Sequence, residues 1–199
     1  MEEKKFFTSK NIAVLGVLAA FVIVLQIFGS YFVIAGTVRL SFVLVPIVLG
    51  AIMTGVVGGM ILGLLFGVLT LVMGIAGADP FTFVLFSQHP ILTILTCVVK
   101  GTAAGFLSGL AYNLLYSKNR TAAVFTASAI APIVNTGLFI LGALLMSDTL
   151  SSEFVPNGSS VIYFLIIDCA GINFLIELGI NLLLAPSVCR IIKSVRKTR

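Results

Sequence analysis

Long apolar segments, each able to cross a lipid bilayer as a helix, dominate the sequence. A helix needs about 20 residues, rising 1.5 Å per residue, to span roughly 30 Å of hydrocarbon. Five segments reach this length, at about residues 11–29, 57–75, 91–116, 122–146 and 161–192. A sixth segment, at about 40–53, is shorter. It must therefore cross a thinned bilayer, be buried by its neighbours, or be extended by residues 30–39.

Charged residues are too scarce to coat a water-soluble domain of this size. They make up 10% of the 199 residues, whereas 59% are apolar; soluble domains average about 25% charged residues. We therefore predict an all-α fold, in which residues 1–199 form a single integral membrane domain, a bundle of six helices. The first segment is longer than the roughly 7–15 apolar residues of a signal-peptide core, so we expect it to remain in the mature protein.

The positions of the basic residues predict the topology. Ten of the twelve Lys and Arg residues lie before the first segment, in the loop at 117–121, or at the end of the chain. Six spans place all three regions on one side, and the positive-inside rule makes that side cytoplasmic. Both termini are therefore expected in the cytoplasm. Because the net charge of +5 is explained by topology, we do not expect a nucleic-acid partner.

Small residues recur at four-residue spacing in three of the segments. Lipid gives apolar helices no hydrophobic reason to associate, so close packing depends on such residues. They form one ridge in the third span, another in the fourth, and a shorter patch in the first: Gly55, Gly59, Gly63 and Gly67; Gly101, Gly105 and Gly109; and Ala13, Gly16 and Ala20. Each set either packs helices within the bundle or docks a separate membrane subunit.

Four polar residues are expected at a similar depth, roughly 10–18 Å below the outer helix ends: Lys100, Asn135, Asp168 and Asn173. Such residues are costly inside a bilayer and usually face partners, water or substrate. Lys100 is either in a structural ion pair with Asp168 or Glu177, or a cationic anchor for an acidic ligand that enters from outside. Asn135 follows Pro132, which loosens its helix, and this favours a site.

Four further polar residues, in two pairs, are interpreted separately. Gln88 and His89 precede Pro90 at the start of the fourth span, where they are either solvated loop residues or part of the mouth of a site. Glu177 and Asn181, one helical turn apart, are interpreted mainly as contacts between helices.

No motif for catalysis, nucleotide binding or metal binding is present, so we expect neither an enzyme nor a resident cofactor. Cys97, Cys169 and Cys189 lie within apolar segments without CxxC spacing and are interpreted as packing residues. The chain also lacks the repeated filter sequence of a channel and two clear inverted halves.

Over about residues 10–190 the chain resembles the substrate-binding S component of an energy-coupling factor (ECF) vitamin transporter. The resemblance rests on six spans with both ends inside, on the Ala13/Gly16/Ala20 patch, and on the order of the following motifs: 44–50 (LVPIVLG) followed by 54–55 (TG), the Gly59/Gly63/Gly67 ridge, 99–101 (VKG), 131–137 (APIVNTG), and Glu177 with Asn181.

The resemblance implies a multi-pass protein of a prokaryotic cell membrane that binds a small vitamin from outside. The vitamin would be covered by the first loop and by loops 76–90 and 147–160. The partners would be one ECF transmembrane subunit, docked on the small patch of the first helix, and two ATPase subunits. Gly16 stands where an alanine is more usual in the family.

A basic anchor at Lys100 suits a carboxylate, so pantothenate, folate and biotin are favoured over uncharged riboflavin, and the local pattern is most similar to the pantothenate branch. The candidate substrate-binding residues are Lys100, Asn135, Asp168, Asn173, His89 and Gln88. Two alternatives remain, a stand-alone secondary carrier and a non-transporting membrane scaffold.

Overall fold

The computed structural model describes residues 8–29, 33–34, 38–39, 42–155 and 160–197 and is helical almost throughout this part of the chain. Four long helices are continuous, and a fifth long apolar segment is composite: α1 (Ser9–Gly29), α3 (Val56–Ile75), α5 (Pro90–Tyr116), α6 (Arg120–Leu144), and α8 (Val161–Tyr163) with η1 (Phe164–Gly171) and α9 (Ile172–Lys197). All five are long and apolar enough to cross a membrane, and α2 (Leu44–Thr54) is a shorter apolar helix. The prediction of an all-helical membrane fold is confirmed.

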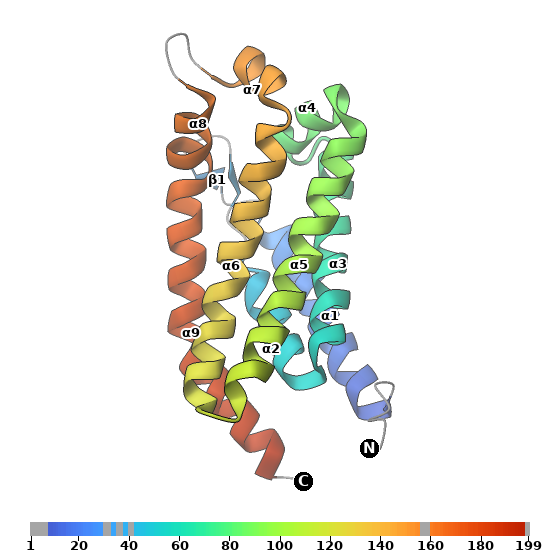
Figure 1. Ribbon diagram of the computed structural model, residues 1–199. Helices are drawn as coiled ribbons and strands as arrows, with labels where there is room; N and C mark the ends of the chain where they lie inside the picture. Colours follow the sequence, from blue (N-terminus) through green and yellow to red (C-terminus); the bar gives the residue numbers. More distant parts are fainter. Residues whose placement is uncertain (1–7, 30–32, 35–37, 40–41, 156–159, 198–199) are drawn as a thin grey trace.

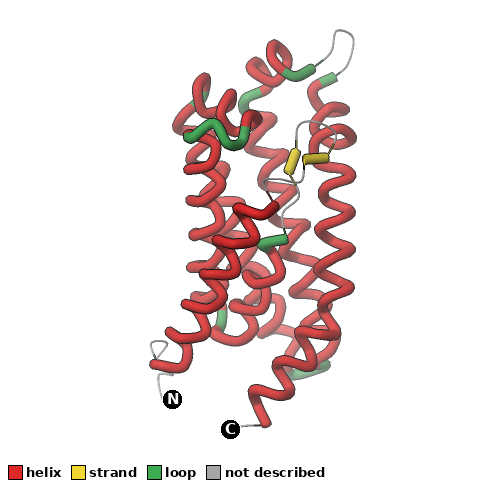
Figure 2. The backbone as a smooth tube through the Cα atoms, turned by 180° about the vertical axis from the view of Figure 1, so that it is seen from behind, coloured by secondary structure: helices red, strands yellow, loops and turns green. Residues whose placement is uncertain are grey.

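The helices form a bundle in which the start of α1 and the end of α9 lie at the same end (Figure 1). At the opposite end lie two short helices, α4 (Pro80–Gln88) and α7 (Ser147–Glu153), and the view from behind shows the same arrangement (Figure 2). We call the end that carries α4 and α7 the cap end. Residues 76–90 and 147–160 were expected to be plain loops, and each instead contains one of these helices. Pro80 occupies the first turn of α4, where its missing N–H is not needed.

Glycines bring α3 and α5 into backbone contact. A Cβ atom at Gly59 would lie 2.5 Å from the carbonyl oxygen of Gly105. A Cβ at Gly63 would collide with the carbonyl of Gly101, and a Cβ at Gly101 would collide with that of Gly63. The ridges in the third and fourth spans therefore pack against each other within the bundle, and the alternative in which they dock another subunit is wrong.

The short helix α2 is buried by its neighbours, which resolves how so short a segment is accommodated. Leu44, Ile47 and Val48 are at most 1% exposed, and α2 packs against α1, α3 and α5. Gly55, at the junction with α3, has a φ of +88°, which glycine adopts without strain. The described part of 30–39 does not extend α2, because β1 (Val33–Ile34) and β2 (Val38–Arg39) form a short antiparallel pair.

The last apolar segment is not a uniform α-helix. Residues 164–171 form a π-helix, η1, between α8 and α9. A Cβ atom at Gly171 would lie 2.6 Å from the carbonyl oxygen of Ile166, five residues earlier, so the wide turn passes close to the glycine. Pi-helical turns are rare and change which side chains face the neighbouring helices. This change of register decides the position of Asp168, described below.

Candidate functional site

An aromatic cluster lies under α4 and α7 at the cap end. The ring of Phe81, on α4, lies 4.9 Å from that of Phe154, which follows α7, and 5.7 Å from that of Phe139 on α6. Phe154 in turn stacks on Phe164 of η1 at 6.2 Å. These contacts join the two short helices to the long helices below them.

Lys100 lies directly beneath this cluster with its ammonium group between two rings. Its Nζ is 5.0 Å from the centre of the Phe139 ring and 5.9 Å from that of Phe66 on α3. Lys100 is half-buried, and such cation–π contacts are favourable but replace only part of the hydration that its ammonium group loses there. Within the described part of the chain, no carboxylate lies within ion-pair distance of Lys100, so the expected structural pair with Asp168 or Glu177 is not formed.

Asn135 is placed on α6 one helical turn from Phe139, facing the bundle interior. It is 7% exposed, and its Oδ1 atom is buried without a hydrogen-bond partner among the described residues. Leaving a buried carbonyl oxygen without a hydrogen bond costs about 1–3 kcal/mol. Such unsatisfied side-chain amides are therefore rare in protein interiors and call for an explanation. Pro132, one turn earlier, lies inside the same helix.

A second buried amide oxygen belongs to Asn173 on α9. The Nδ2 of Asn173 donates to Oε1 of Glu177 at 3.4 Å, but its own Oδ1 is buried without a partner among the described residues. Glu177 and Asn181 follow at four-residue spacing on the same face and are 2% and 3% exposed. Asn181 donates to the backbone carbonyl of Glu177 at 2.8 Å, which is a contact within α9 itself.

Asp168 is the candidate that the structure sets apart from the others. It is exposed on η1, beside exposed Ile166 and Ile167, and forms no ion pair with Lys100. The expectation that it shares one layer with Lys100 and Asn135 assumed α-helical spacing. In the π-helical turn it is the neighbours Cys169 and Ala170 that are buried.

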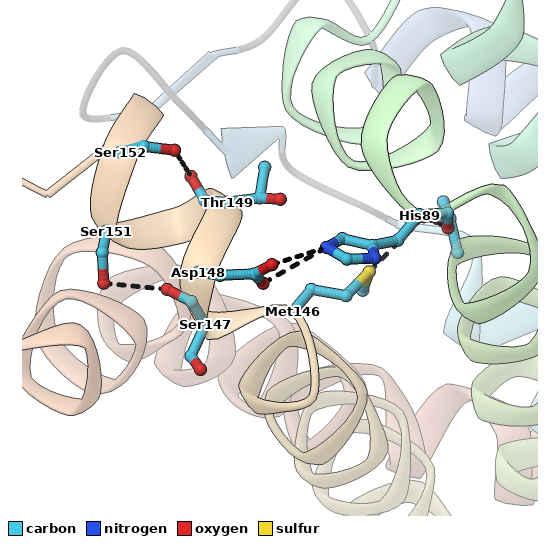
Figure 3. Close-up of polar contacts among 8 residues, drawn as sticks. His89, Met146, Ser147, Asp148, Thr149, Ser151 and Ser152 are labelled. Atoms are coloured by element: carbon cyan, nitrogen blue, oxygen red, sulfur yellow. Dashed lines mark hydrogen bonds and ion pairs between the residues drawn. The ribbon is translucent and has the colours of Figure 1, made fainter.

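His89 joins the two short-helix regions across the cap end (Figure 3). It lies between α4 and α5, and its Nε2 is 3.2 Å from both carboxylate oxygens of Asp148 on α7. Beside this pair, the hydroxyl of Thr93 donates to the carbonyl of His89 at 2.8 Å and contacts Sδ of Met146 at 3.5 Å. Gln88, in contrast, is exposed at the end of α4.

Residues that pattern reasoning missed include the two rings around Lys100. Phe66 and Phe139 are two of 16 phenylalanines, and nothing in their spacing distinguishes them. Thr102 on α5 also has a buried hydroxyl without a partner among the described residues. A threonine within an apolar helix is too common to have been singled out.

The small patch on α1 faces away from the bundle. Ala13, Gly16 and Ala20 are all exposed, and a Cβ added at Gly16 would meet no atom within 4 Å. Large apolar side chains flank the patch, with Val17 58% and Phe21 55% exposed. Unlike the ridges of α3 and α5, this patch has no neighbour within the described chain.

Lys100 is a group that can bind an anion, and the Oδ1 atoms of Asn135 and Asn173 can accept hydrogen bonds from polar groups. Within the described residues no three His, Cys, Asp or Glu side chains gather closely enough to hold a metal ion.

Comparison with known proteins gives one match. A family model described as "ECF transporter, substrate-specific component" covers residues 10–189. No curated protein and no solved structure matches the chain significantly.

Proposed function

Because the chain belongs to the family of ECF transporter substrate-specific components, we propose that it captures a small water-soluble vitamin for ATP-driven uptake. Membership makes it a substrate-binding transporter subunit rather than an enzyme, and its apolar helices make it a multi-pass membrane protein. The proposal adds the class of ligand, its site, the orientation in the membrane and the partners.

The observation that carries the proposal is the position of Lys100. Its half-buried ammonium group lies against the rings of Phe66 on α3 and Phe139 on α6, without a carboxylate partner in the described chain. An acidic ligand would supply the missing charge, and charge-assisted hydrogen bonds are stronger inside a protein than in water. Asn135 and Asn173 complete the site in this proposal. His89 and Gln88 border its mouth, and Asp168 is its least supported member because it is exposed.

Pantothenate is the ligand we favour, because it combines a carboxylate with an amide and two hydroxyl groups. Biotin and folate also carry carboxylates and remain the next candidates. Riboflavin has no carboxylate and would leave Lys100 without an ionic partner.

We place the cap end outside the cell and both termini in the cytoplasm of a prokaryotic cell. The support is that the start of α1, the junction between α5 and α6 and the end of α9 lie at one end of the bundle (Figure 1). Lys10 is in the first turn of α1, and Lys118 and Arg120 are at that junction, as the positive-inside rule requires of a cytoplasmic end. The vitamin then enters between the cap helices from the outer side.

The proposed partners are an ECF transmembrane subunit and two ATPase subunits. The exposed Ala13/Gly16/Ala20 patch of α1 supports docking there, since small residues let another helix approach closely within a bilayer. Because the chain has no phosphate-binding glycine loop, the partners would hydrolyse the ATP.

A binding experiment with Lys100→Met tests the proposed function. Purified protein is titrated with water-soluble vitamins while ligand binding and thermal unfolding are followed. We expect one acidic vitamin to bind the wild type and to lose about 10- to 100-fold in affinity in the variant, the loss of a charge-assisted bond. Lys118→Met, the same change in the loop between α5 and α6, should bind normally. Equal affinity of the Lys100→Met variant and the wild type would contradict the site.

A further inference from the structure

We infer that the ligand carries one carboxylate at one end and hydroxyl or amide groups at the other, and that it binds with the carboxylate toward the cap end. Lys100 would hold the carboxylate, and the amides of Asn135 and Asn173 would hold the far end, deeper in the bundle. The inference rests on the proposed function, because it assumes that this interior is the vitamin site.

The direction of the Lys100 side chain sets the outer end of the site. Lys100 lies ten residues from the start of α5 at Pro90, roughly 15 Å from the cap end. Helical side chains lean toward the N-terminus of their helix, which for α5 is the cap end. The contact of Nζ with the ring of Phe139, only five residues from the cap end of α6 at Leu144, agrees with this direction.

The two amides lie on the deeper side of that ammonium group. Asn135 starts nine residues from Leu144, roughly 14 Å from the cap end, and leans further inward because α6 runs toward the cap. Asn173 is twelve residues from Val161, at most roughly 18 Å from the cap end because the π-helix η1 lies between them, and leans outward along α9, toward the level of Asn135. Since α6 packs against both α5 and α9, the three residues lie on adjoining helices, with the cation nearer the cap end than the amides.

Unsatisfied atoms identify the chemistry of the deeper end. Both Asn135 Oδ1 and Asn173 Oδ1 are buried without partners among the described residues, and the Asn135 side chain is more than nine-tenths buried. Buried polar atoms are almost always paired, so these two are open to donors that the described part of the chain does not provide. Hydroxyl and amide groups of a ligand supply donors at that depth, whereas an apolar end would bury the amides permanently unpaired.

A site with a cation at one end and hydrogen-bond acceptors at the other divides the candidate vitamins into classes. Pantothenate and biotin each have one carboxylate and a distant group of hydroxyl or amide-like donors. Nicotinate and lipoate have a carboxylate without distant donors, and riboflavin and thiamine have no carboxylate. A site that hydrogen-bonds part of its substrate rejects analogues that lack the matching group, because the protein group is left unpaired.

The test measures the binding of each ligand to each protein variant. Wild type, Lys100→Met and Asn135→Leu are titrated with pantothenate, biotin, nicotinate, lipoate, riboflavin and thiamine. Each vitamin that binds is also tested as its carboxamide and, where the chemistry allows, without its far-end hydroxyl or amide donors. Asn181→Leu is the matched control. It makes the same change at a buried amide that already donates to a carbonyl, two turns deeper than Asn173.

We expect binding from pantothenate or biotin alone. Conversion to the carboxamide should weaken binding to the wild type about 10- to 100-fold and have little effect in Lys100→Met. Asn135→Leu should weaken the acid and its carboxamide by the same factor, because it acts on the other end of the molecule. Removing the far-end donors should weaken binding to the wild type more than binding to Asn135→Leu, in which only Asn173 remains to accept from them. Asn181→Leu should bind like the wild type.

The possible failures are distinguishable. If no vitamin binds the wild type, the proposed function fails, and this inference fails with it. If a vitamin of another class binds, or if Asn135→Leu binds its ligand as tightly as the wild type, the function stands and the inferred orientation is wrong. The ligand analogues test the same orientation on wild-type protein, even where a variant does not fold.

Discussion

Asp148 lies in the first turn of α7, where a backbone amide and a ring nitrogen both reach its carboxylate. The N–H of Thr149 is the main cause of a lowered pKa, the charge of His89 adds to it, and partial desolvation opposes both. The side chain is 72% exposed, so its effect is local. It ties α7 to the junction between α4 and α5 without contributing much to the stability of the bundle.

The sign of the pH effect follows from the lowered pKa of Asp148. A carboxylate whose pKa is depressed on folding stabilises the fold above its unfolded pKa of about 3.9, and this is lost as the pH falls through the folded value. We therefore expect α7 to loosen below about pH 4 in the wild type. Hydrogen exchange of 147–153 measures this directly.

Asp148→Asn should show faster exchange at neutral pH and no further acid-dependent increase from this position. Glu153→Gln, at the other end of α7, serves as the control and should retain the wild-type profile. An unchanged exchange rate in Asp148→Asn would show that the His89 contact does not hold α7.

At the scale of single helices, the small residues of α3 and α5 and those of α1 have different roles. On α3 and α5 the glycines allow backbone contact, and on α1 the small residues face outward. The same sequence signal, small residues at four-residue spacing, therefore marks an internal interface in one case and an unpartnered face in the other. Spacing alone could not separate these, because it does not say which side of a helix meets the bundle.

Substituting alanine at equivalent glycines separates the two roles. Gly63→Ala drives a Cβ into the carbonyl of Gly101 and should destabilise the protein by about 1–3 kcal/mol, the usual range for overpacking. Gly16→Ala meets open space and should be neutral, or stabilising by roughly 0.5–1 kcal/mol through its higher helix propensity. Thermal unfolding in one detergent compares them. Equal melting temperatures would refute the close contact of α3 and α5.

Docking of α1 predicts a different pattern for a larger side chain. Gly16→Leu should fold and bind its vitamin like the wild type, because the position faces away from the bundle. It should nevertheless fail to co-purify with the ECF transmembrane subunit. Val72→Ala, which trims an exposed side chain of α3, is the control and should assemble normally. Assembly of Gly16→Leu would place the docking surface elsewhere.

At the scale of the whole molecule, the long apolar helices could be predicted from the sequence, because hydrocarbon thickness sets their length and leaves little choice of secondary structure. The π-helix could not, since its sequence is as apolar as that of its neighbours, and Asp168 was misplaced for that reason. The helices α4 and α7 were missed because they are shorter than a span. Lys100 and Asn135 could be identified as unusual residues, but packing decides that, among the described residues, Lys100 has no carboxylate partner and Asn135 Oδ1 no donor.

The orientation of the molecule has its own test. Ser152→Cys places a thiol at an exposed position of α7, and Lys118→Cys places one in the exposed loop between α5 and α6. In intact cells a membrane-impermeant maleimide should label Ser152→Cys above the wild-type background. It should label Lys118→Cys only after permeabilisation. The reverse pattern would place the cap end in the cytoplasm.

The central claim is that the bundle interior around Lys100 holds one small acidic molecule. Native mass spectrometry of protein purified from vitamin-replete cells tests it most directly. We predict a single added mass per chain that matches a water-soluble vitamin with a carboxylate, present in the wild type and absent from Lys100→Met. A chain without added mass that also remains unbound after incubation with each candidate vitamin would contradict the claim.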